Sequence, residues 1–209
     1  MGTLKIGILV SGSGTNLQAI LDAVGEHSLD AEIRLVISNV PNVLALERAR
    51  LAGVPHKVIS HRDFANRELF DQALVDELRQ ADVEWVVLAG FMRVLTPTFL
   101  LAFERRIINI HPALLPAFPG THAQKQALDY GVKFAGCTVH FVDAGVDTGP
   151  IIAQRVVPVL DDDDESRLSQ RILEQEHQLL VEVLRWLAAG RVRVTSDARS
   201  RSRVVITAP

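Results

Sequence analysis

Short apolar runs alternate with amphipathic segments through the first half of the chain. Three mainly apolar runs are typical of strands buried in a parallel sheet: Leu4–Val10, Ile33–Ile37 and Trp85–Leu88. His56–Ile59 is a plausible further strand, third in chain order. Three intervening segments have apolar residues at helical spacing: Thr15–Val24, Leu44–Leu51 and Phe64–Leu78. Gly53-Val54-Pro55 is a stop signal after the second of these helices.

This alternation predicts an α/β fold. Strands that alternate with helices form a Rossmann-like, mostly parallel sheet with right-handed crossovers and helices on both faces. Ligands in such sheets bind beyond the carboxyl ends of the strands. We therefore expect the loops after Val10, Leu88 and Ile110 to lie along one edge and to carry the chemistry.

The second half of the chain has a different pattern. Arg106–Ile110 predicts a strand that leads into His111-Pro112, and Val139–Val142 and Ile151–Val157 predict an antiparallel pair. Asp164–Ala189 has the spacing of one long helix, which Gly190 ends. We expect a single domain over residues 1–190. The tail, 191–209, holds two β-type runs and predicts a surface hairpin or a partly disordered end.

The composition is that of an ordinary globular protein. The 209 residues are 48% hydrophobic and 22% charged, with a formal net charge of -3. This balance lacks the basic bias of a nucleic-acid or membrane binder, and no apolar run approaches the roughly 18 residues of a membrane span. Cys137 is the single cysteine, so an internal disulfide is impossible and the cytoplasm is the expected compartment.

The first candidate functional loop is Ser11–Asn16, between a strand and a helix. Gly12 and Gly14 let the backbone approach a ligand, and amides at a helix start attract an anion. The third glycine of a dinucleotide fingerprint is replaced by Leu17, and the lysine of a P-loop is absent. A single phosphate is the favoured ligand. The alternative is a plain strand-to-helix turn capped by Thr15 or Ser13.

The second loop follows Asn109 and His111. Alternate residues of a strand share a face, so these two side chains point the same way. An amide beside an imidazole suits an acyl-transfer site, where both can stabilise an oxyanion. The proline-rich segment that continues to Pro119-Gly120 favours a rigid, specially shaped loop. The alternative is an asparagine that closes a turn beside a structural histidine.

The third loop is rich in aspartate and glycine, from Asp143 to Gly149. Asp147 could orient an imidazole or a water, whereas a turn built by Asp and Gly is the simpler interpretation. The loop lacks the remaining ligands of a calcium site, and no zinc ligand set is present in the sequence.

Two further features have a structural interpretation. Cys137 is interpreted as a small buried residue, and Asp161–Glu165 as the cap of the long helix.

Taken together, these segments resemble the folate-dependent phosphoribosylglycinamide formyltransferases. The matching pieces are VSGSGTNLQAI near the start, AGFMRVL at Ala89–Leu95, INIHPALLPAFPG at Ile108–Gly120, GCTVHFVDAGVDTGPIIAQ at Gly136–Gln154 and QEHQLL in the last helix. The resemblance extends from Lys5 to about Arg191, and the third and fourth pieces are specific in combination.

The resemblance implies a catalytic trio of Asn109, His111 and Asp147. The substrate amine of N1-(5-phospho-D-ribosyl)glycinamide attacks the formyl carbon of 10-formyltetrahydrofolate, a step of purine biosynthesis. The transfer is direct, with neither a covalent enzyme intermediate nor a metal. Asn109 and a protonated His111 stabilise the oxyanion, and Asp147 supports His111 and positions a proton-carrying water. His140 is expected to support the trio.

The resemblance also assigns the binding residues. The ribose phosphate is expected at Gly14, Thr15 and Asn16, and the sugar or glycinamide part at Glu176. The folate pocket is expected to comprise Arg67, Met92, Arg93, Val94, Leu95 and Asp143. Leu115–Pro116 is a candidate cis peptide. Leu173 departs from the family, which often has a polar residue three positions before Glu176 that helps to hold the substrate.

Three alternatives differ in acceptor or in class. A formyltetrahydrofolate hydrolase usually carries an N-terminal regulatory domain, whereas this sequence starts at the first strand. A methionyl-tRNA formyltransferase needs an RNA-binding domain, for which the few arginines of the tail are insufficient. A non-catalytic phosphate-binding module explains the glycine loop but leaves the trio as coincidence. The residues leave open whether the protein is a homodimer.

Overall fold

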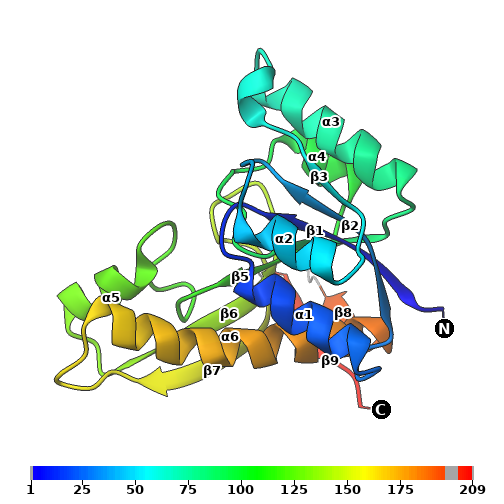
Figure 1. Cartoon of the computed structure of the whole chain (residues 1–209). Coiled ribbons are helices and arrows are strands. Elements are labelled where there is room, and N and C mark those ends of the chain that lie inside the picture. Colours follow the sequence, from blue (N-terminus) through cyan, green and yellow to red (C-terminus); the bar gives the residue numbers. More distant parts are fainter. Residues whose placement is uncertain (1, 196–201, 209) are drawn as a thin grey trace. The chain divides into compact units, whose positions relative to one another are not determined.

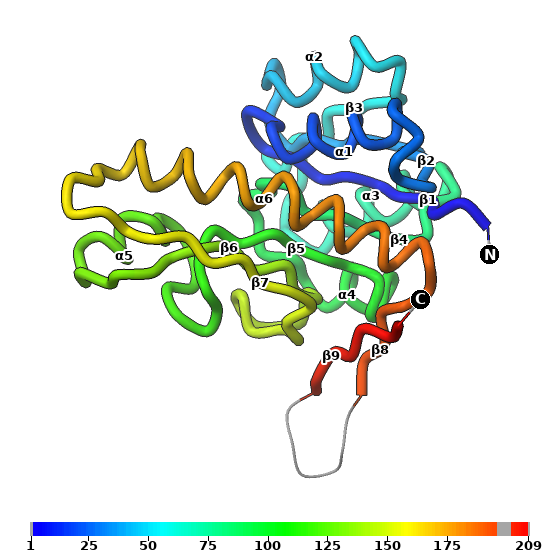
Figure 2. The backbone as a smooth tube through the Cα atoms, turned by 90° about the horizontal axis from the view of Figure 1, so that it is seen from below, coloured from blue at the N-terminus to red at the C-terminus, as the bar shows by residue number. Residues whose placement is uncertain are grey.

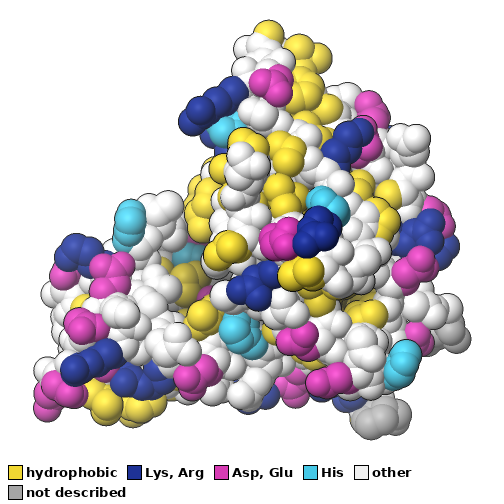
Figure 3. All heavy atoms as spheres, in the orientation of Figure 1, with side chains coloured by type: hydrophobic (Ala, Val, Ile, Leu, Met, Phe, Trp, Pro, Cys, Tyr) yellow, Lys and Arg dark blue, Asp and Glu magenta, His cyan; other side chains and the backbone are white. Residues whose placement is uncertain are grey.

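The computed structural model describes residues 2–195 and 202–208. The chain forms two compact units, residues 1–109 and residues 110–209. Figure 1 shows the elements of both units along the chain. On the face drawn in Figure 3, acidic and basic side chains are interspersed, as expected for a chain of small net charge.

The first unit contains a parallel sheet. Its strands are β1 (Leu4–Val10), β2 (Ala31–Ser38), β3 (His56–Val58), β4 (Trp85–Leu88) and β5 (Ile107–His111), whose last two residues belong to the second unit. The strand order is β3-β2-β1-β4-β5, and each neighbouring pair is parallel. This order brings the carboxyl ends of β1 and β4 side by side, as predicted for the loops after Val10 and Leu88.

Helices cover both faces of this sheet. They are α1 (Thr15–Gly25), α2 (Leu44–Leu51), α3 (Arg67–Gln80) and α4 (Pro97–Ala102), with a 3-10 turn, η1, at His61–Asp63. Helix α1 contacts α2 on one face, and α3 contacts α4 on the other (Figure 2). Gly7 allows close packing, because a Cβ atom there would lie 2.5 Å from Leu78 Cδ2.

The second unit is built on an antiparallel strand pair. Strands β6 (Phe134–Phe141) and β7 (Ile151–Pro158) pair in antiparallel register, with Thr138 opposite Gln154. The long helix α6 (Glu165–Ala188) contacts both strands and also α5 (Ala123–Tyr130). The apolar stripe of α6 is buried: Leu168, Ile172, Leu179, Leu180, Val183, Leu184 and Leu187.

The two β-type runs of the tail form strands β8 (Val192–Thr195) and β9 (Arg203–Ile206). They pair in antiparallel register, and β9 contacts β7 (Figure 2). The hairpin predicted for residues 191–209 is therefore present, while residues 196–201, which connect its strands, and residue 209 lie outside the described residues.

The predicted fold class is confirmed, with a parallel sheet in the first unit and antiparallel strands in the C-terminal half. Helix α2 and strand β4 have the predicted bounds. Helix α3 begins three residues later than predicted, because Asn66 Oδ1 accepts the Leu69 amide at 2.9 Å and sets the helix start. Within the described residues, no helix is long and apolar enough to cross a membrane.

Candidate active site

The glycine loop begins α1 without a side-chain cap. Gly14 is the N-cap residue, with a left-handed φ of 70°, so the alternative of a Thr15 or Ser13 cap is wrong. An added Cβ at Gly14 would lie 2.6 Å from Ala45 Cβ and 2.7 Å from Ala45 Cα. Both the conformation and the space therefore require glycine. The positive end of the α1 dipole lies at this loop, as an anion site needs.

Helix α2 holds the outer side of the same loop. The Ala45 amide donates to Gly12 O at 3.1 Å, and Arg48 Nε donates to Ser13 O at 2.9 Å. A second Arg48 nitrogen donates to Gln18 Oε1 at 3.0 Å. The loop is therefore fixed through its own carbonyl oxygens.

The predicted folate segment follows β4. Met92 and Val94 are exposed, Arg93 is half-buried, and Leu95 is buried. A terminal nitrogen of Arg67 donates to the Val94 carbonyl at 2.6 Å, so the structure brings Arg67 to this segment. The Met92 amide donates to Ser11 Oγ at 2.9 Å, which joins the segment to the first residue of the glycine loop.

Strand β5 carries Asn109 and His111 as alternate residues. Asn109 is half-buried at the end of the first unit, and His111 is 4% exposed at the start of the second. The structure therefore confirms that both residues lie at alternate positions of one strand.

Both ring nitrogens of His111 have partners within the second unit. Nε2 lies 2.9 Å from the Phe118 carbonyl oxygen, and Nδ1 lies 3.3 Å from Asp147 Oδ2. A carbonyl oxygen only accepts, so Nε2 carries a proton. A carboxylate oxygen also only accepts, so both ring nitrogens of His111 face hydrogen-bond acceptors.

Asp147 lies between two histidines. Besides His111, it has His140 Nε2 at 3.6 Å from Oδ1, and the Gly120 amide donates to Oδ2 at 2.8 Å. Burial of this carboxyl group favours its neutral form. The hydrogen bonds from His140 and the Gly120 amide, with the charge of His111, outweigh burial and lower the pKa of Asp147 below its ordinary value. Asp147 is therefore ionised at neutral pH.

Asp143 has a different role from Asp147. Its carboxylate accepts the Thr148 hydroxyl at 2.6 Å and the Gly145 amide at 3.1 Å, as in a turn built by aspartate. An added Cβ at Gly149 would lie 1.8 Å from the Phe141 carbonyl oxygen, so this loop also needs glycine. The turn interpretation holds for the Asp143 carboxylate, which is exposed at the surface of the loop.

The third acidic candidate is Glu176 on α6, which is buried at 6% exposure. Burial and the nearby charge of Glu176 raise the pKa of the Cys137 thiol to about 12. Cys137 is fully buried, in agreement with its interpretation as a small core residue. Asp164 caps α6 by accepting the Arg167 amide at 2.8 Å, so the predicted acidic cap is confirmed.

Sequence reasoning missed the partners that act through the backbone. The Phe118 carbonyl and the Gly120 amide hold His111 and Asp147, but backbone groups leave no trace in residue type. The signal was the Pro119-Gly120 pair, which indicated an unusual loop. Phe118 and Asp147 have left-handed φ angles of 53° and 55°. The Leu115–Pro116 bond is cis, as predicted.

The sequence matches the formyl transferase family over residues 4–184. It is 41% identical to phosphoribosylglycinamide formyltransferase of Escherichia coli over 195 residues, which are 93% of this chain and 92% of the relative. The structure is similar to that of glycinamide ribonucleotide transformylase 1 from Symbiobacterium toebii, with a TM-score of 0.93, 50% identity, and coverage of 98% of this chain and 94% of that chain.

The chain also matches a part of longer proteins. It is 50% identical over 199 residues, 94% of its length, to the trifunctional purine biosynthetic protein adenosine-3 of Drosophila melanogaster, and it spans 15% of that relative's length. The family match covers most of the chain, and relatives of similar length agree with it in sequence and in fold. The chain belongs to the formyl transferase family.

Proposed function

We propose that this chain transfers the formyl group of 10-formyltetrahydrofolate to the amine of N1-(5-phospho-D-ribosyl)glycinamide. The observation that carries the proposal is the buried His111 imidazole between the ionised Asp147 carboxylate and the Phe118 carbonyl. This arrangement favours a cation that can stabilise an oxyanion. The names of the Escherichia coli and Symbiobacterium toebii relatives support this reaction and this acceptor.

The reaction is a direct transfer. The amine nitrogen attacks the formyl carbon, and the carbonyl electron pair moves to oxygen, where Asn109 and protonated His111 stabilise the negative charge. A water held by Asp147 accepts the amine proton and delivers a proton to folate N10. The oxyanion then collapses and the bond from carbon to N10 breaks. Each residue thus stabilises a charge that develops along the path.

Asp147 and His140 set the charge of the site. Because its pKa is lowered, Asp147 is an anion at neutral pH, and its negative charge faces the His111 ring. His140, on β6, contacts the second carboxylate oxygen and has its other ring nitrogen 2.8 Å from the Phe141 carbonyl. His140 thus limits the orientations that Asp147 can adopt, and we assign it a supporting role.

The loop at Phe118 has a place in this mechanism. His111 Nε2 is bonded to the Phe118 carbonyl, and Nδ1 faces Asp147. An oxyanion that takes a hydrogen bond from Nε2 has to displace the Phe118 carbonyl. We therefore expect residues 117–121 to shift when substrate binds, with the Gly120 amide still available to Asp147.

The binding groups complete the proposal. The ribose phosphate binds the glycine loop at Gly14, Thr15 and Asn16, where the dipole of α1 favours an anion. The folate lies against residues 92–95, with the exposed Met92 and Val94 side chains available for contact. Arg67, Arg93, Asp143 and Glu176 keep the ligand roles that the family resemblance assigns. We further propose a metal-free cytoplasmic enzyme, whose rate EDTA should leave unchanged.

An absorbance assay tests the function. Purified protein is mixed with a 10-formyl folate, with and without glycinamide ribonucleotide, and folate product is followed with time. Product that forms only with the nucleotide supports the proposal. Equal product without it means that water is the acceptor, as in a hydrolase. No product in either case, with phosphate binding retained, means a binding module or another acceptor.

A further inference from the structure

A chain of hydrogen bonds runs along the carboxyl edge of the parallel sheet in the first unit. Its four members each follow a different strand: His61 follows β3, Asn39 follows β2, Ser11 follows β1, and the Met92 amide follows β4. The strands lie in the order β3-β2-β1-β4. Each member therefore bonds to the member from the next strand.

Three distances define this series of hydrogen bonds. Asn39 Nδ2 lies 3.3 Å from His61 Nδ1, Ser11 Oγ donates to Asn39 Oδ1 at 2.6 Å, and the Met92 amide donates to Ser11 Oγ at 2.9 Å. The Ser11 hydroxyl thus uses its proton toward β2 and a lone pair toward β4. Asn39 uses its oxygen toward Ser11, so its amino group faces His61, whose Nδ1 accepts.

The two central members of this network are Ser11 and Asn39. Asn39 is 4% exposed, and Ser11 is half-buried. Removal of the Ser11 hydroxyl leaves the buried Asn39 oxygen without this partner, which costs more than the loss of a bond in solvent, and it also removes the bond to the Met92 amide. His61 lies at the outer end, where its ring also makes an edge contact with Phe70.

This series of hydrogen bonds connects two segments that the proposed function assigns to different substrates. Ser11 is the first residue of the glycine loop, which takes the ribose phosphate. Met92 begins the exposed part of the folate segment. The hydrogen bond from the Met92 amide to Ser11 Oγ joins these segments directly, and the bond to Asn39 fixes the Ser11 rotamer that makes it.

We propose that Ser11 and Asn39 are positioning residues that hold the phosphate loop and the folate segment in register. This inference rests on the proposed function of those two segments. Neither side chain is required to touch the reacting atoms. Their loss lets the loop and the segment move separately, so the affinities for nucleotide and for folate decrease together.

The main test is Ser11→Ala, with Ser11→Thr as the variant that retains a hydroxyl. In Ser11→Ala we expect KM for both substrates to rise about tenfold, from the net value of the lost bonds, and kcat to change much less. Ser11→Thr should restore most of both affinities. A rise in KM for one substrate alone, or none for either, overturns the proposal.

Asn39 provides a second, independent pair of variants. Asn39→Asp keeps the oxygen that accepts the Ser11 hydroxyl, whereas Asn39→Leu removes it. We expect weakened binding of both ligands in Asn39→Leu and a much smaller effect in Asn39→Asp. Equal effects in the two variants contradict a role through Ser11. Ser28→Ala is the matched control, because Ser28 Oγ donates to the Ala23 carbonyl, outside both segments.

Binding measurements separate this inference from the proposed function. Calorimetric titration with ribose 5-phosphate and with folic acid requires no turnover. If the wild type binds both probes without catalysing transfer, and Ser11→Ala weakens both, the positioning role stands while the function fails. If transfer occurs and Ser11→Ala binds both probes as the wild type does, the positioning role fails while the function stands.

Discussion

The two units of the molecule use polar groups in different ways. In the first unit, neutral groups at the strand ends bond to one another: Ser11 to Asn39, and the Met92 amide to Ser11. In the second unit, three ionisable side chains, His111, His140 and Asp147, are gathered at low exposure. Neutral networks fix shape, whereas buried charges change the free energy of charged states.

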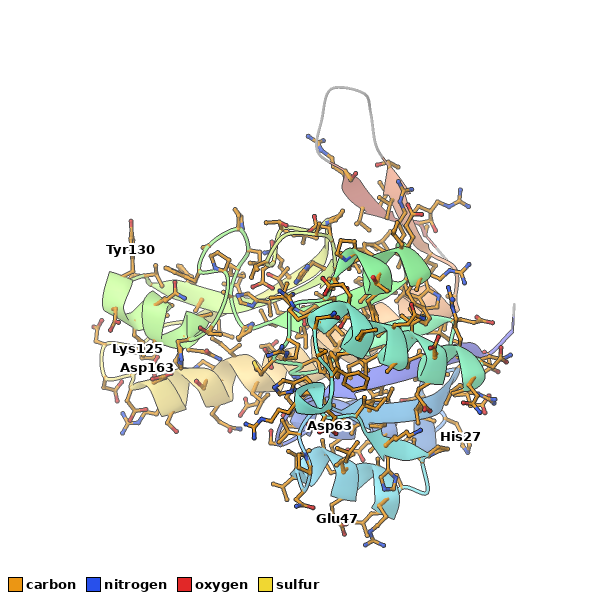
Figure 4. All side chains as sticks on the ribbon, turned by 90° about the horizontal axis from the view of Figure 1, so that it is seen from above. His27, Glu47, Asp63, Lys125, Tyr130 and Asp163 are labelled. Atoms are coloured by element: carbon orange, nitrogen blue, oxygen red, sulfur yellow. The ribbon has the colours of Figure 1, made fainter. Side chains whose placement is uncertain are left out.

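This difference predicts a division of labour. Substitutions among the strand-end groups of the first unit should act on KM, because they change the shape of the binding segments. Substitutions among the ionisable groups of the second unit should act on kcat, because they change the stabilisation of developing charge. The following variants test this division, from the largest expected effect to the smallest. Lys125, which is labelled on α5 in Figure 4 and pairs with Asp129 of the same helix, is a surface control outside both groups.

The largest effect is expected for His111→Ala. The variant loses the cation that faces the oxyanion, so kcat should fall by about 10²–10⁴-fold. The dissociation constant for ribose 5-phosphate should change by less than about twofold, because the proposed phosphate site is built by other residues, Gly14, Thr15 and Asn16. Steady-state kinetics and calorimetry measure the two quantities. A variant with wild-type kcat would remove His111 from the mechanism and favour a binding module.

Asp147→Asn should have the next largest effect. The amide retains the size of the side chain but loses the negative charge beside His111, and kcat should fall by about 10²-fold. The matched control is Asp143→Asn, whose carboxylate accepts bonds within its own loop and is exposed. If Asp143→Asn lowers kcat as strongly as Asp147→Asn, the special role of Asp147 is wrong.

Gly14→Ala should reduce nucleotide binding rather than chemistry. The left-handed φ of 70° and the Cβ position 2.7 Å from Ala45 Cα force the loop to move. We expect KM for the nucleotide to rise about tenfold or more and thermal stability to fall. Gly12→Ala is the matched control, because a Cβ there meets nothing within 4 Å. Equal KM values for the two variants contradict a phosphate site at Gly14.

The activity should change with pH through at least one ionisation between about pH 5 and 8, the range in which a histidine ordinarily titrates. Asp147 cannot supply this change, because its pKa is lowered and it is already ionised there. The profile of kcat/KM from pH 5 to 9 measures it. A flat profile in the wild type contradicts the mechanism.

The same lowered pKa has a consequence for stability. A carboxyl group with a depressed pKa in the folded state stabilises the fold above its unfolded value, near 3.8, and this stability is lost as pH falls through the folded pKa. Urea unfolding at pH 7 and at pH 3 should therefore show a smaller loss of stability in Asp147→Asn than in the wild type. Equal losses would mean that the carboxyl group is not held as an anion.

The fold could be predicted well where the pattern is local. Continuous apolar runs gave the parallel strands, and the buried stripe of α6 has the predicted spacing. The short helix α4 was missed because six residues offer too few turns for a periodic signal, and α5 was missed because its buried face consists only of Ala123 and Ala127. The start of α3 was missed because one capping bond at Asn66 decided it.

The candidate site was predictable only in its side chains. The residue types and spacing of Asn109, His111 and Asp147 indicate an acyl-transfer site, and the family resemblance assigns their proposed roles. The Phe118 carbonyl and the Gly120 amide depend on how a loop folds back, which no residue type encodes. The bond from Ser11 to Asn39 joins residues 28 positions apart and depends on strand order.

The smallest effect is expected at Cys137, an ionisable group of the second unit that the mechanism does not use. The thiol is fully buried, and burial with the charge of Glu176 raises its pKa to about 12, so at pH 8 almost none is thiolate. Iodoacetamide should leave both the mass and the activity of the folded protein unchanged, whereas the urea-unfolded protein should gain one adduct. Rapid alkylation of the folded protein with loss of activity would contradict this burial. Low reactivity here would separate a buried group that stays neutral, as at Cys137, from a buried group that its partners keep charged, as at Asp147.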